Sequence, residues 1–564
     1  MGAIAADVAG PQAIRLAIDR GIADQNTTLI LAFAATAAGL LIARGVLTAV
    51  HDFLIQYMAH KVSRDMRNEY FSHLQTLSYS YYDRANSGDL ISRAVSDIES
   101  ARMAVGMGLF QIITVTGTFV VVFIAMVLTN WQLAVLAMVT LPVMVGTALK
   151  FGKVIRQLWR RVQAQRGEMT AVLTENLTGV RVVKAFAQEP RQIERYSGSV
   201  RQLNDNMLAA MRNWSVFFPL MLFLSSLGTV AVIWLGGYLV ITDVVSVGAL
   251  IAFYYYFVRL APPSRRIGFI VQRLQLAIAS AERLFEVLDT KPEIASKAGA
   301  LAPRAVRGRV EFDHVTFAYG RGAPQLRDIN LVIEPGQTLG IIGPTGSGKT
   351  TLINLIMRFY DVSSGHLTFD GTDVRDLDLH WLRSRIAMVP QDAYLFSNTM
   401  AKNIAFARPS ARLDAIVAAA EQAQAGRFID ALPDRYDTIV GERGVGLSGG
   451  QRQRVTISRA LLMNAGVLIM DDSTASLDTA TERLIREELQ EAFSGRTTIL
   501  IGQRVSTVMN CDEIVVMDAG KIVERGTHEA LLAARGLYHR INLLQSPAEA
   551  LEIDGRPASG GNPG

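Results

Sequence analysis

Long uncharged stretches dominate the first half of the chain. No charged residue occurs from Met103 to Leu149, a run about twice the ~20 residues that one helix needs to cross a bilayer. Thr129-Asn130-Trp131, near the middle of this run, predicts two spans joined by a very short turn. Other uncharged runs cover 25–43, 213–242 and 244–258. We therefore predict five membrane-spanning helices, at about 27–57, 105–129, 131–150, 214–241 and 246–268.

Basic residues are concentrated in two of the intervening segments, 58–104 and 151–212. Because loops rich in Lys and Arg face the cytoplasm, both segments and everything after residue 268 are predicted to be cytoplasmic. Both segments are too long for turns, and their mixture of polar and apolar positions predicts helices that continue below the membrane. The chain is thus predicted to be a multi-pass protein of the cytoplasmic (plasma) membrane.

The N-terminal stretch does not complete this topology. Five spans with 58–104 inside would place residue 1 outside, yet residues 1–20 show no basic region ahead of an apolar core, as an export signal would. We therefore expect a sixth helix whose first half is missing here, seen as a partial span at about 1–18. A genuinely short or re-entrant first helix is the alternative. The predicted transmembrane domain covers 1–290.

A different pattern begins after about residue 290. Short β-branched runs alternate there with turn residues and helical stretches, which is typical of an α/β domain. We interpret 291–305 as a linker, 306–544 as the α/β domain and 545–564 as a disordered tail. The predicted fold is therefore a helical membrane domain fused to an α/β domain.

The composition excludes several classes of protein. Only 19% of the 564 residues are charged and half are apolar, which is unusual for a soluble enzyme. The single cysteine, Cys511, excludes a disulfide scaffold and a cysteine-based zinc site. A net charge of +5 without any Lys/Arg tract argues against nucleic acid as a partner.

A phosphate-binding loop follows the predicted buried strand 339–342. Residues 343–350 have the Walker A spacing and run into the apolar helix 352–359. Glycines let consecutive backbone N–H groups face phosphate oxygens, and the helix N-terminus adds positive potential. Lys349 would reach the β- and γ-phosphates, and the Thr350 hydroxyl would ligate Mg²⁺. The predicted ATP-binding residues of this loop are Gly343, Pro344, Thr345, Gly346, Ser347, Gly348, Lys349, Thr350 and Thr351. The α/β domain is thus a P-loop NTPase domain.

A second predicted strand, 467–470, ends in two acids. A carboxylate at this position suits a Mg²⁺ partner, so Asp471 is predicted to be the Walker B acid. Asp472 lies where a base or a water-orienting group would be, with a purely structural acid as the alternative.

Another helix start follows the sequence Leu447-Ser448-Gly449-Gly450-Gln451. Two glycines and a serine ahead of the helical stretch 452–462 make a second anion-binding helix N-terminus. Because the Walker A loop already serves this chain's own nucleotide, we predict that the second start serves a nucleotide on another subunit.

Together these motifs resemble an ATP-binding cassette (ABC) exporter half-transporter of the multidrug/lipid exporter type, from about residue 11 to 544. In that family two chains each contribute six helices and one nucleotide-binding domain, and ATP lies between one chain's Walker A and the other chain's LSGGQ. The resemblance implies an ABC-type ATPase coupled to transport, with ATP and Mg²⁺ as cofactors. It also implies three partners: a second half-transporter subunit, membrane lipid and a small-molecule or lipid substrate.

The resemblance assigns further residues one by one. Tyr319 is similar to the aromatic residue that stacks on adenine, and Gln391 to the Q-loop residue that touches Mg²⁺ and faces the membrane domain. Asp478 is similar to the D-loop acid that meets the opposite site, and Glu442 to the X-loop acid near the coupling helices. The segments around 82–90 and 175–189 resemble the two coupling regions, of which the second reaches the partner's nucleotide-binding domain in this family.

Two residues depart from the family pattern. The family has Asp-Glu after Walker B where this chain has Asp471-Asp472, and the family's switch histidine is Gln503 here. Asp reaches about 1.5 Å less far than Glu, and a misplacement of ~1 Å can lower a rate by roughly a hundredfold. Gln503 can donate a hydrogen bond but cannot carry a proton or a positive charge. We therefore predict a site that binds MgATP and cleaves it slowly, with Asp472, Gln503 and Gln391 as its catalytic residues and Thr350, Gln391 and Asp471 around the metal.

The LSGGQ sequence itself is intact, which predicts a heterodimer. This chain would complete the partner's active site through Leu447, Ser448, Gly449, Gly450, Gln451 and Asp478. The alternative is a homodimer with two slow sites.

The predicted function is ATP-driven export of an apolar or amphipathic small molecule or lipid. Spans rich in Ala, Val, Phe and Met with few charges fit such a cargo. Arg44 and Arg259 lie inside predicted spans, where they either contact substrate or face a wet cavity or the interface. A regulatory ATPase of exporter shape and an importer remain alternatives.

Overall fold

The computed structural model describes all residues except 1, 321, 442–443, 445, 473–494 and 546–564. The chain divides into two compact units. The helical unit comprises Met1–Gln75 and Asn86–Thr290, and the α/β unit comprises Thr76–Ala85 and Lys291–Gly564. The short segment 76–85 therefore belongs to the α/β unit although it lies early in the sequence.

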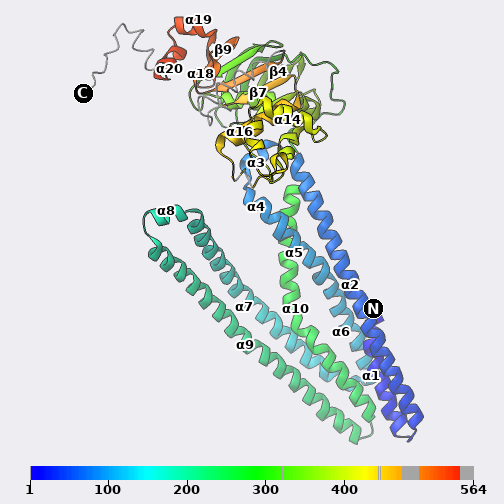
Figure 1. Ribbon diagram of the computed structural model, residues 1–564. Helices are drawn as coiled ribbons and strands as arrows, with labels where there is room; N and C mark the ends of the chain where they lie inside the picture. Colours follow the sequence, from blue (N-terminus) through cyan, green and yellow to red (C-terminus); the bar gives the residue numbers. More distant parts are fainter. Residues whose placement is uncertain (1, 321, 442–443, 445, 473–494, 546–564) are drawn as a thin grey trace. The chain divides into compact units, whose positions relative to one another are not determined.

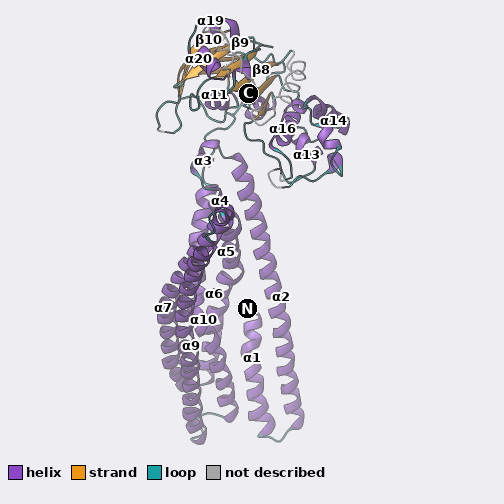
Figure 2. Cartoon of the chain, turned by 60° about the vertical axis from the view of Figure 1, so that its left-hand side comes forward, coloured by secondary structure: helices purple, strands orange, loops and turns teal. Residues whose placement is uncertain are grey.

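Helices account for nearly all of the helical unit (Figures 1 and 2). The α-helices are α1 (Gly2–Leu16), α2 (Thr27–Thr76), α4 (Ser87–Ser92), α5 (Ile98–Met103), α6 (Phe110–Thr129), α7 (Trp131–Thr178), α8 (Val180–Ala185), α9 (Glu189–Ile241) and α10 (Val247–Leu288). Wider π-helical turns occupy Ala17–Ile22, Arg93–Asp97 and Ala104–Leu109. Among the described residues, three continuous helices are long and apolar enough to cross a membrane, at Thr27–Thr76, Ser87–Thr129 and Glu189–Ile241. Val247–Leu260 is a shorter apolar helix.

The turn inside the long uncharged run is a single residue. Asn130 has extended backbone angles, and its side-chain Oδ1 accepts a hydrogen bond from the N–H of Leu133 at 3.0 Å, which caps α7. Ser246 caps α10 in the same way, through the N–H of Ala249 at 3.1 Å. These short capped turns reverse the chain between α6 and α7 and between α9 and α10, so the two helices of each pair run antiparallel.

Packing in the helical unit centres on α7, α9 and α10. Figure 1 shows α7 and α9 running beside each other, with α8 at one end of the pair. Of the aromatic run 253–257, Phe253, Tyr256 and Phe257 are fully buried, while Tyr254 and Tyr255 are partly exposed. A Cβ on Gly228 of α9 would lie 2.4 Å from Phe257 Cζ, so glycine is needed for this close approach. Most of the aromatic run is therefore a packing stripe.

Two sheets form the α/β unit. The antiparallel sheet has the order β2-β1-β4-β5 and contains β1 (Val310–Phe317), β2 (Leu326–Ile333), β4 (Ser364–Phe369) and β5 (Thr372–Asp373). The larger sheet has the order β10-β9-β3-β8-β7-β6 and contains β3 (Thr338–Ile342), β6 (Ile386–Val389), β7 (Val467–Asp471), β8 (Thr497–Gly502), β9 (Glu513–Asp518) and β10 (Lys521–Gly526). All neighbours in the larger sheet are parallel except β9 and β10.

The described residues of the α/β unit also contain helices. They are α3 (Tyr79–Arg84), α11 (Lys349–Ile356), α12 (Leu379–Ser384), α13 (Met400–Ile404), α14 (Leu413–Gln422), α15 (Gly426–Asp430), α16 (Gly449–Met463), α18 (Val505–Val508), α19 (His528–Ala533) and α20 (Leu537–Gln545). Apart from Thr338 at the start of β3 and Asp471 at the end of β7, these two strands are apolar, and they are almost completely buried, as expected for parallel strands covered on both faces. The fold confirms the predicted class, a helical membrane domain fused to an α/β nucleotide-binding domain.

Candidate nucleotide-binding site

The predicted phosphate-binding loop connects β3 to α11. A Cβ on Gly343 would lie 2.1 Å from the carbonyl oxygen of Met517, so any side chain there would clash with the backbone. Gly348 has φ 101° and directly precedes the first residue of α11, a conformation that residues with side chains rarely adopt. The loop therefore curls over the N-terminus of α11, where its backbone N–H groups can face an anion.

Lys349 is folded back over this loop. Its Nζ donates hydrogen bonds to the carbonyl oxygens of Gly343 at 2.8 Å and Pro344 at 2.9 Å, and its side chain is buried. Burial lowers the pKa of Lys349, while Asp471 and Asp472 act in the opposite direction. The loop thus holds the ammonium group at the place where a phosphate would meet it.

Thr350 and Asp471 meet at the end of β7. The Thr350 hydroxyl donates a hydrogen bond to Asp471 Oδ2 at 3.2 Å. Asp471 is buried, and burial raises its pKa, with Asp472 adding to the rise and Thr350 and Lys349 opposing it. A hydroxyl and a carboxylate are the hard oxygen ligands that Mg²⁺ takes, so these two residues fit the metal. Within the described residues no group of three or more His, Cys, Asp or Glu could hold a metal.

Asp472 and Gln503 follow two neighbouring parallel strands. Asp471 of β7 is opposite Ile501 of β8, and the N–H of Asp472 donates to the Ile501 carbonyl oxygen at 2.9 Å. Ile342, which leads into the phosphate-binding loop, is opposite Gly502 on the other side of β8. Asp472 and Gln503 therefore lie at the same sheet edge as the loop.

Gln391 lies at this edge as well. It is exposed and comes two residues after β6, which pairs with β7 in parallel. The four predicted motif positions of the sheet thus gather at the carboxyl ends of β6, β7, β8 and β3, where ligands of open α/β sheets bind.

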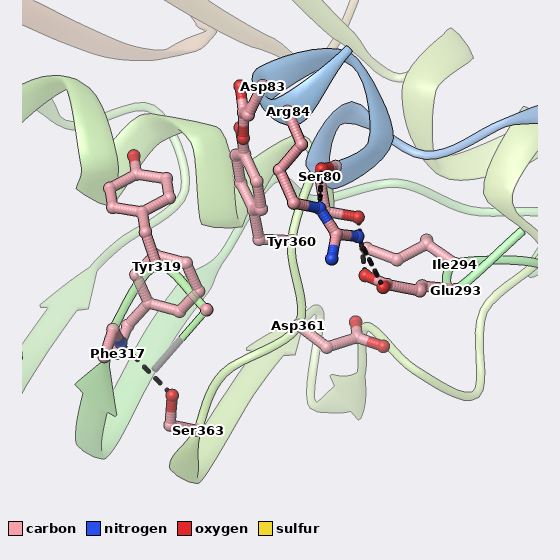
Figure 3. Close-up of a pocket in the computed structure, with 12 residues that line it drawn as sticks. Ser80, Asp83, Arg84, Glu293, Ile294, Phe317, Tyr319, Tyr360, Asp361 and Ser363 are labelled. Carbon is pink, nitrogen blue, oxygen red and sulfur yellow. Dashed lines mark hydrogen bonds and ion pairs between the residues drawn. The ribbon is translucent and has the colours of Figure 1, made fainter. Parts of the chain in front are cut away.

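Tyr319 lies on the rim of a cavity of about 520 Å³ within the α/β unit (Figure 3). Its hydroxyl is 3.1 Å from Thr351 Oγ1, and its ring meets that of Tyr360 edge to face at 5.1 Å. Tyr319 as a whole remains 38% exposed, although the rings of Phe317 and Tyr360 both contact its ring. The cavity size suits a small ligand.

The segment α3 closes the other side of this cavity. Figure 3 shows Asp83 and Arg84 beside Tyr360 and Glu293. The Tyr360 hydroxyl donates to Asp83 Oδ2 at 2.7 Å, and Arg84 pairs with Glu293 at 3.2 Å. Part of the predicted first coupling region, 82–90, is therefore packed within the α/β unit. The predicted second region, 175–189, forms the end of α7, all of α8 and the start of α9 (Figure 1).

The LSGGQ sequence caps α16. Gln451 N–H donates to Ser448 Oγ at 3.2 Å and Ser448 N–H donates to Gln451 Oε1 at 2.8 Å, a reciprocal capping box. Gly449, Gly450 and Gln451 form the first helical turn, so α16 begins three residues earlier than predicted. Leu447 packs partly buried against the core beneath. Asp478 and Glu442 lie outside the described residues.

Two further residues lie at or near the site: Ser347, which the Walker A spacing predicted, and Gln545, which no sequence pattern indicated. Ser347 Oγ is buried and has no hydrogen-bond partner among the described residues. Gln545, the last residue of α20, contacts the segment that carries Gln503, although we predicted that it begins a disordered tail. Pairings over such sequence distances cannot be seen in local patterns.

Comparison with known proteins identifies the family of this chain. The family described as "ABC transporter transmembrane region" matches residues 1–261, and the family described as "ABC transporter" matches 326–475. Over 532 residues the chain is 35% identical to the ATP-dependent lipid A-core flippase of Syntrophus aciditrophicus, covering 94% of this chain and 88% of that protein. Over 511 residues it is 37% identical to the fatty acid ABC transporter ATP-binding/permease protein of Mycobacterium tuberculosis, covering 90% and 80%.

A solved structure extends the similarity to the whole fold. The ATP-bound structure of a bacterial Atm1-family ABC exporter matches with a TM-score of 0.81 at 28% identity, covering 99% of this chain and 98% of that chain. Its apolar helices and its match to the transmembrane family place this chain in a membrane, with the nucleotide-binding domain in the cytoplasm. The chain therefore belongs to the ABC transporter family, as an exporter that joins a helical transmembrane region to an ATP-binding domain and couples ATP hydrolysis to translocation.

Proposed function

We propose that this chain is one half of a two-subunit exporter of lipid or fatty acid-type amphiphiles, with a slow ATP site of its own. The names of two relatives, a lipid A-core flippase and a fatty acid transporter, support an amphiphilic cargo. The few charges in the predicted spans fit the same class of substrate.

The observation that carries the proposal is the position of Asp472 and Gln503. Gln503 follows β8, which pairs with the Walker A strand β3, and Asp472 follows β7, which pairs with β8. Both residues therefore lie at the carboxyl ends of these strands, where the phosphate-binding loop also begins. A side chain at Asp472 is thus well placed to orient water, yet it is one carbon–carbon bond shorter than the glutamate of the family pattern.

Different residues of this chain would bind MgATP and position the water for its hydrolysis. The loop N–H groups and Lys349 bind phosphate oxygens, and Thr350 and Asp471 would hold Mg²⁺, which neutralises charge on the phosphates when bound. Asp472 would accept a hydrogen bond from the attacking water but hold it too far from the γ-phosphate. Gln503 would donate an uncharged hydrogen bond where a histidine could carry charge.

The intact LSGGQ assigns this chain a second role. Ser448 and the first turn of α16 would contact the nucleotide on the partner's Walker A loop, together with Asp478. The partner should then carry glutamate after its Walker B aspartate and a switch histidine. Hydrolysis would take place mainly at the partner's site, to which this chain contributes.

The test is ATPase activity of the isolated full-length chain in lipid nanodiscs. We expect MgATP to bind and raise the melting temperature, with turnover at least tenfold below that of the reconstituted pair. Brisk hydrolysis by the isolated chain would contradict the slow site and favour a homodimer. ATP-dependent uptake of a fluorescent fatty acid into inside-out vesicles containing both subunits tests export. The inactive control combines Lys349→Ala in this chain with replacement of the partner's Walker A lysine by alanine.

A further inference from the structure

Three charged side chains from three different helices meet inside the helical unit. Asp7 of α1 pairs through Oδ1 with Arg44 Nε of α2 at 2.7 Å, and through Oδ2 with Arg259 Nη2 of α10 at 2.5 Å. Arg259 Nε makes a second bond to Oδ2, at 2.9 Å. Asp7 is 9% exposed, whereas the side chains of Arg44 and Arg259 are 32% and 44% exposed. We call these residues the ionic triad.

The ionic triad lies at membrane depth. With 1.5 Å per residue, Arg44 is about 25 Å along α2 from Thr27, and Arg259 is about 18 Å along α10 from Val247. The distribution of Lys and Arg predicts that the loops before both helices lie on the non-cytoplasmic side, and the hydrocarbon core is ~30 Å thick. The triad is therefore past the middle of the bilayer, toward the cytoplasm.

The ionic triad has one positive charge too many. Two guanidinium groups share one carboxylate, so their formal charges sum to one unbalanced positive charge. Within the described residues no acid other than Asp7 pairs with either arginine, and the terminal nitrogen atoms of Arg44 make no hydrogen bond. The nearby pair Arg15–Asp19 is balanced by itself. An unbalanced charge at this depth is unfavourable unless an anion or water reaches it.

The surrounding contacts hold the ionic triad in place. The buried Tyr256, one turn before Arg259 on α10, donates a hydrogen bond to the carbonyl oxygen of Val8 at 2.8 Å. Gln12 Nε2 donates to the Tyr256 hydroxyl at 3.0 Å and to Thr129 Oγ1 at 3.2 Å. These bonds fix α1 against α10 and α6, so Asp7 can orient both guanidinium groups while their free donors remain accessible.

We propose that the ionic triad binds the anionic group, a carboxylate or a phosphate, of the transported amphiphile. Guanidinium donors match the planar oxygens of a carboxylate and the tetrahedral oxygens of a phosphate. Asp7 acts as a positioning residue that bridges the two arginines, and the added anion neutralises the remaining charge. This inference rests on the proposed export of an amphiphile and names the group by which the cargo is recognised.

The test is probe binding by the full-length chain in phosphatidylcholine nanodiscs without ATP. The probes are a fluorescent alkyl carboxylate, the alkyl phosphate of the same chain length and the corresponding neutral alcohol. We expect Arg44→Gln and Arg259→Gln each to weaken binding of both anionic probes about tenfold or more, as loss of a charge-assisted hydrogen bond would. Binding of the alcohol should not change.

Controls separate recognition from folding. Arg15→Gln removes an arginine of α1 whose charge is already balanced, and should leave all three affinities unchanged. Arg259→Lys keeps the charge and should retain more anionic-probe binding than Arg259→Gln, which keeps the proposal testable if the glutamine variant fails to fold. Inorganic phosphate at millimolar concentration should not displace the probes, and full displacement would mean that the triad binds free anions instead of cargo.

Equal anionic-probe affinity in the native chain, Arg44→Gln and Arg259→Gln would overturn the proposal. That result would leave the proposed function standing, because ATP-dependent vesicle uptake is measured separately. Conversely, loss of uptake with charge-selective binding intact would count against export and not against the triad.

Discussion

Gln545 holds the segment of Gln503 with both ends of its side-chain amide. Its Nε2 donates to the carbonyl oxygen of Gln503 at 2.6 Å, and its Oε1 accepts from the N–H of Val505 at 2.7 Å. The backbone of the switch position is therefore fixed from α20, at the far end of the domain sequence. The Gln503 side chain is not used in these bonds and stays available to the nucleotide.

Gln545→Ala should loosen this segment without unfolding the domain. The Val505 N–H would lose its acceptor, and one hydrogen bond contributes about 1 kcal/mol. We expect amide hydrogen exchange in the peptide covering 503–508 to accelerate by about five- to tenfold, with exchange in β3 unchanged. Gln545→Glu retains an acceptor for the N–H of Val505, so its exchange rate in this peptide should lie between those of the native chain and Gln545→Ala. Unchanged exchange in Gln545→Ala would show that the clamp contributes nothing in solution.

Restoring the family residues should activate the slow site. Asp472→Glu returns the missing reach and Gln503→His returns a side chain that can carry charge. Since a misplacement of ~1 Å can lower a rate by roughly a hundredfold, we expect ATPase of the double variant to rise by at least tenfold in a reconstituted complex. The partner would carry a Walker B Glu→Gln change, so that only this site is measured. Asp472→Asn in the same background is the control and should stay inactive.

Asp471→Asn should stabilise the domain without nucleotide while weakening its response to MgATP. Because the pKa of Asp471 is raised by burial, the folded state binds its proton more tightly than the unfolded state. Stability therefore falls as pH rises from the ordinary Asp pKa through the folded-state pKa, and the charged carboxylate is unfavourable above that window. Differential scanning fluorimetry should show a higher melting temperature for Asp471→Asn at pH 7 without nucleotide. The increase in melting temperature caused by MgATP should be smaller than in the native chain.

The ion pair between Asp97 and Arg283 should contribute to the stability of the helical unit. Arg283 Nη2 and Nε contact the two oxygens of the buried Asp97 at 2.5 and 2.9 Å. Because Arg283 is 46% exposed, we expect Arg283→Ala to lower stability by only about 1–3 kcal/mol. Arg283→Lys should recover part of this loss, and a native melting temperature for Arg283→Ala would contradict the prediction.

The same pair gives a pH dependence of opposite sign to that of Asp471. Hydrogen bonding to Arg283 lowers the pKa of Asp97, against the effect of burial. The stabilisation is therefore fully present above about pH 4, the ordinary Asp range, and is lost as pH falls through the lower folded-state pKa. As the pH is lowered from about 6 to about 3, the melting temperature of Asp97→Asn should fall less steeply than that of the native chain.

Sequence patterns predicted those parts of this molecule whose structure is set by residues close together in the sequence. Charge-free runs identified long apolar helices, and the glycine spacing of 343–348 identified the loop between β3 and α11, because both are set by neighbouring residues. The contacts of Asp7 with Arg259 and of Gln545 with Gln503 join residues far apart in the chain. Nothing in the local periodicity of α1 or α20 indicates which distant side chain each will meet.

The boundary of α16 shows the same limit on a smaller scale. The glycines of LSGGQ suggested a loop up to residue 451, since glycine disfavours helix interiors. Ser448 and Gln451 cap each other's backbone, and this reciprocal cap lets the helix begin at Gly449. Cap geometry outweighs propensity in the first turn.

In the proposed two-subunit exporter, the cap at Ser448 would affect how fast the site shared with the partner assembles. The oxygen of Ser448 already accepts a bond from Gln451, and its hydroxyl hydrogen has no acceptor among the described residues. The side chains of Ser448 and Gln451 are thus already ordered in the folded chain. The entropic cost of ordering them when the partner's nucleotide binds is therefore lower, by on the order of 0.5–1.5 kcal/mol per side chain. The rate at which the shared site forms would then depend on how often the two nucleotide-binding domains meet in the correct orientation. It would not depend on rearrangement of the first turn of α16.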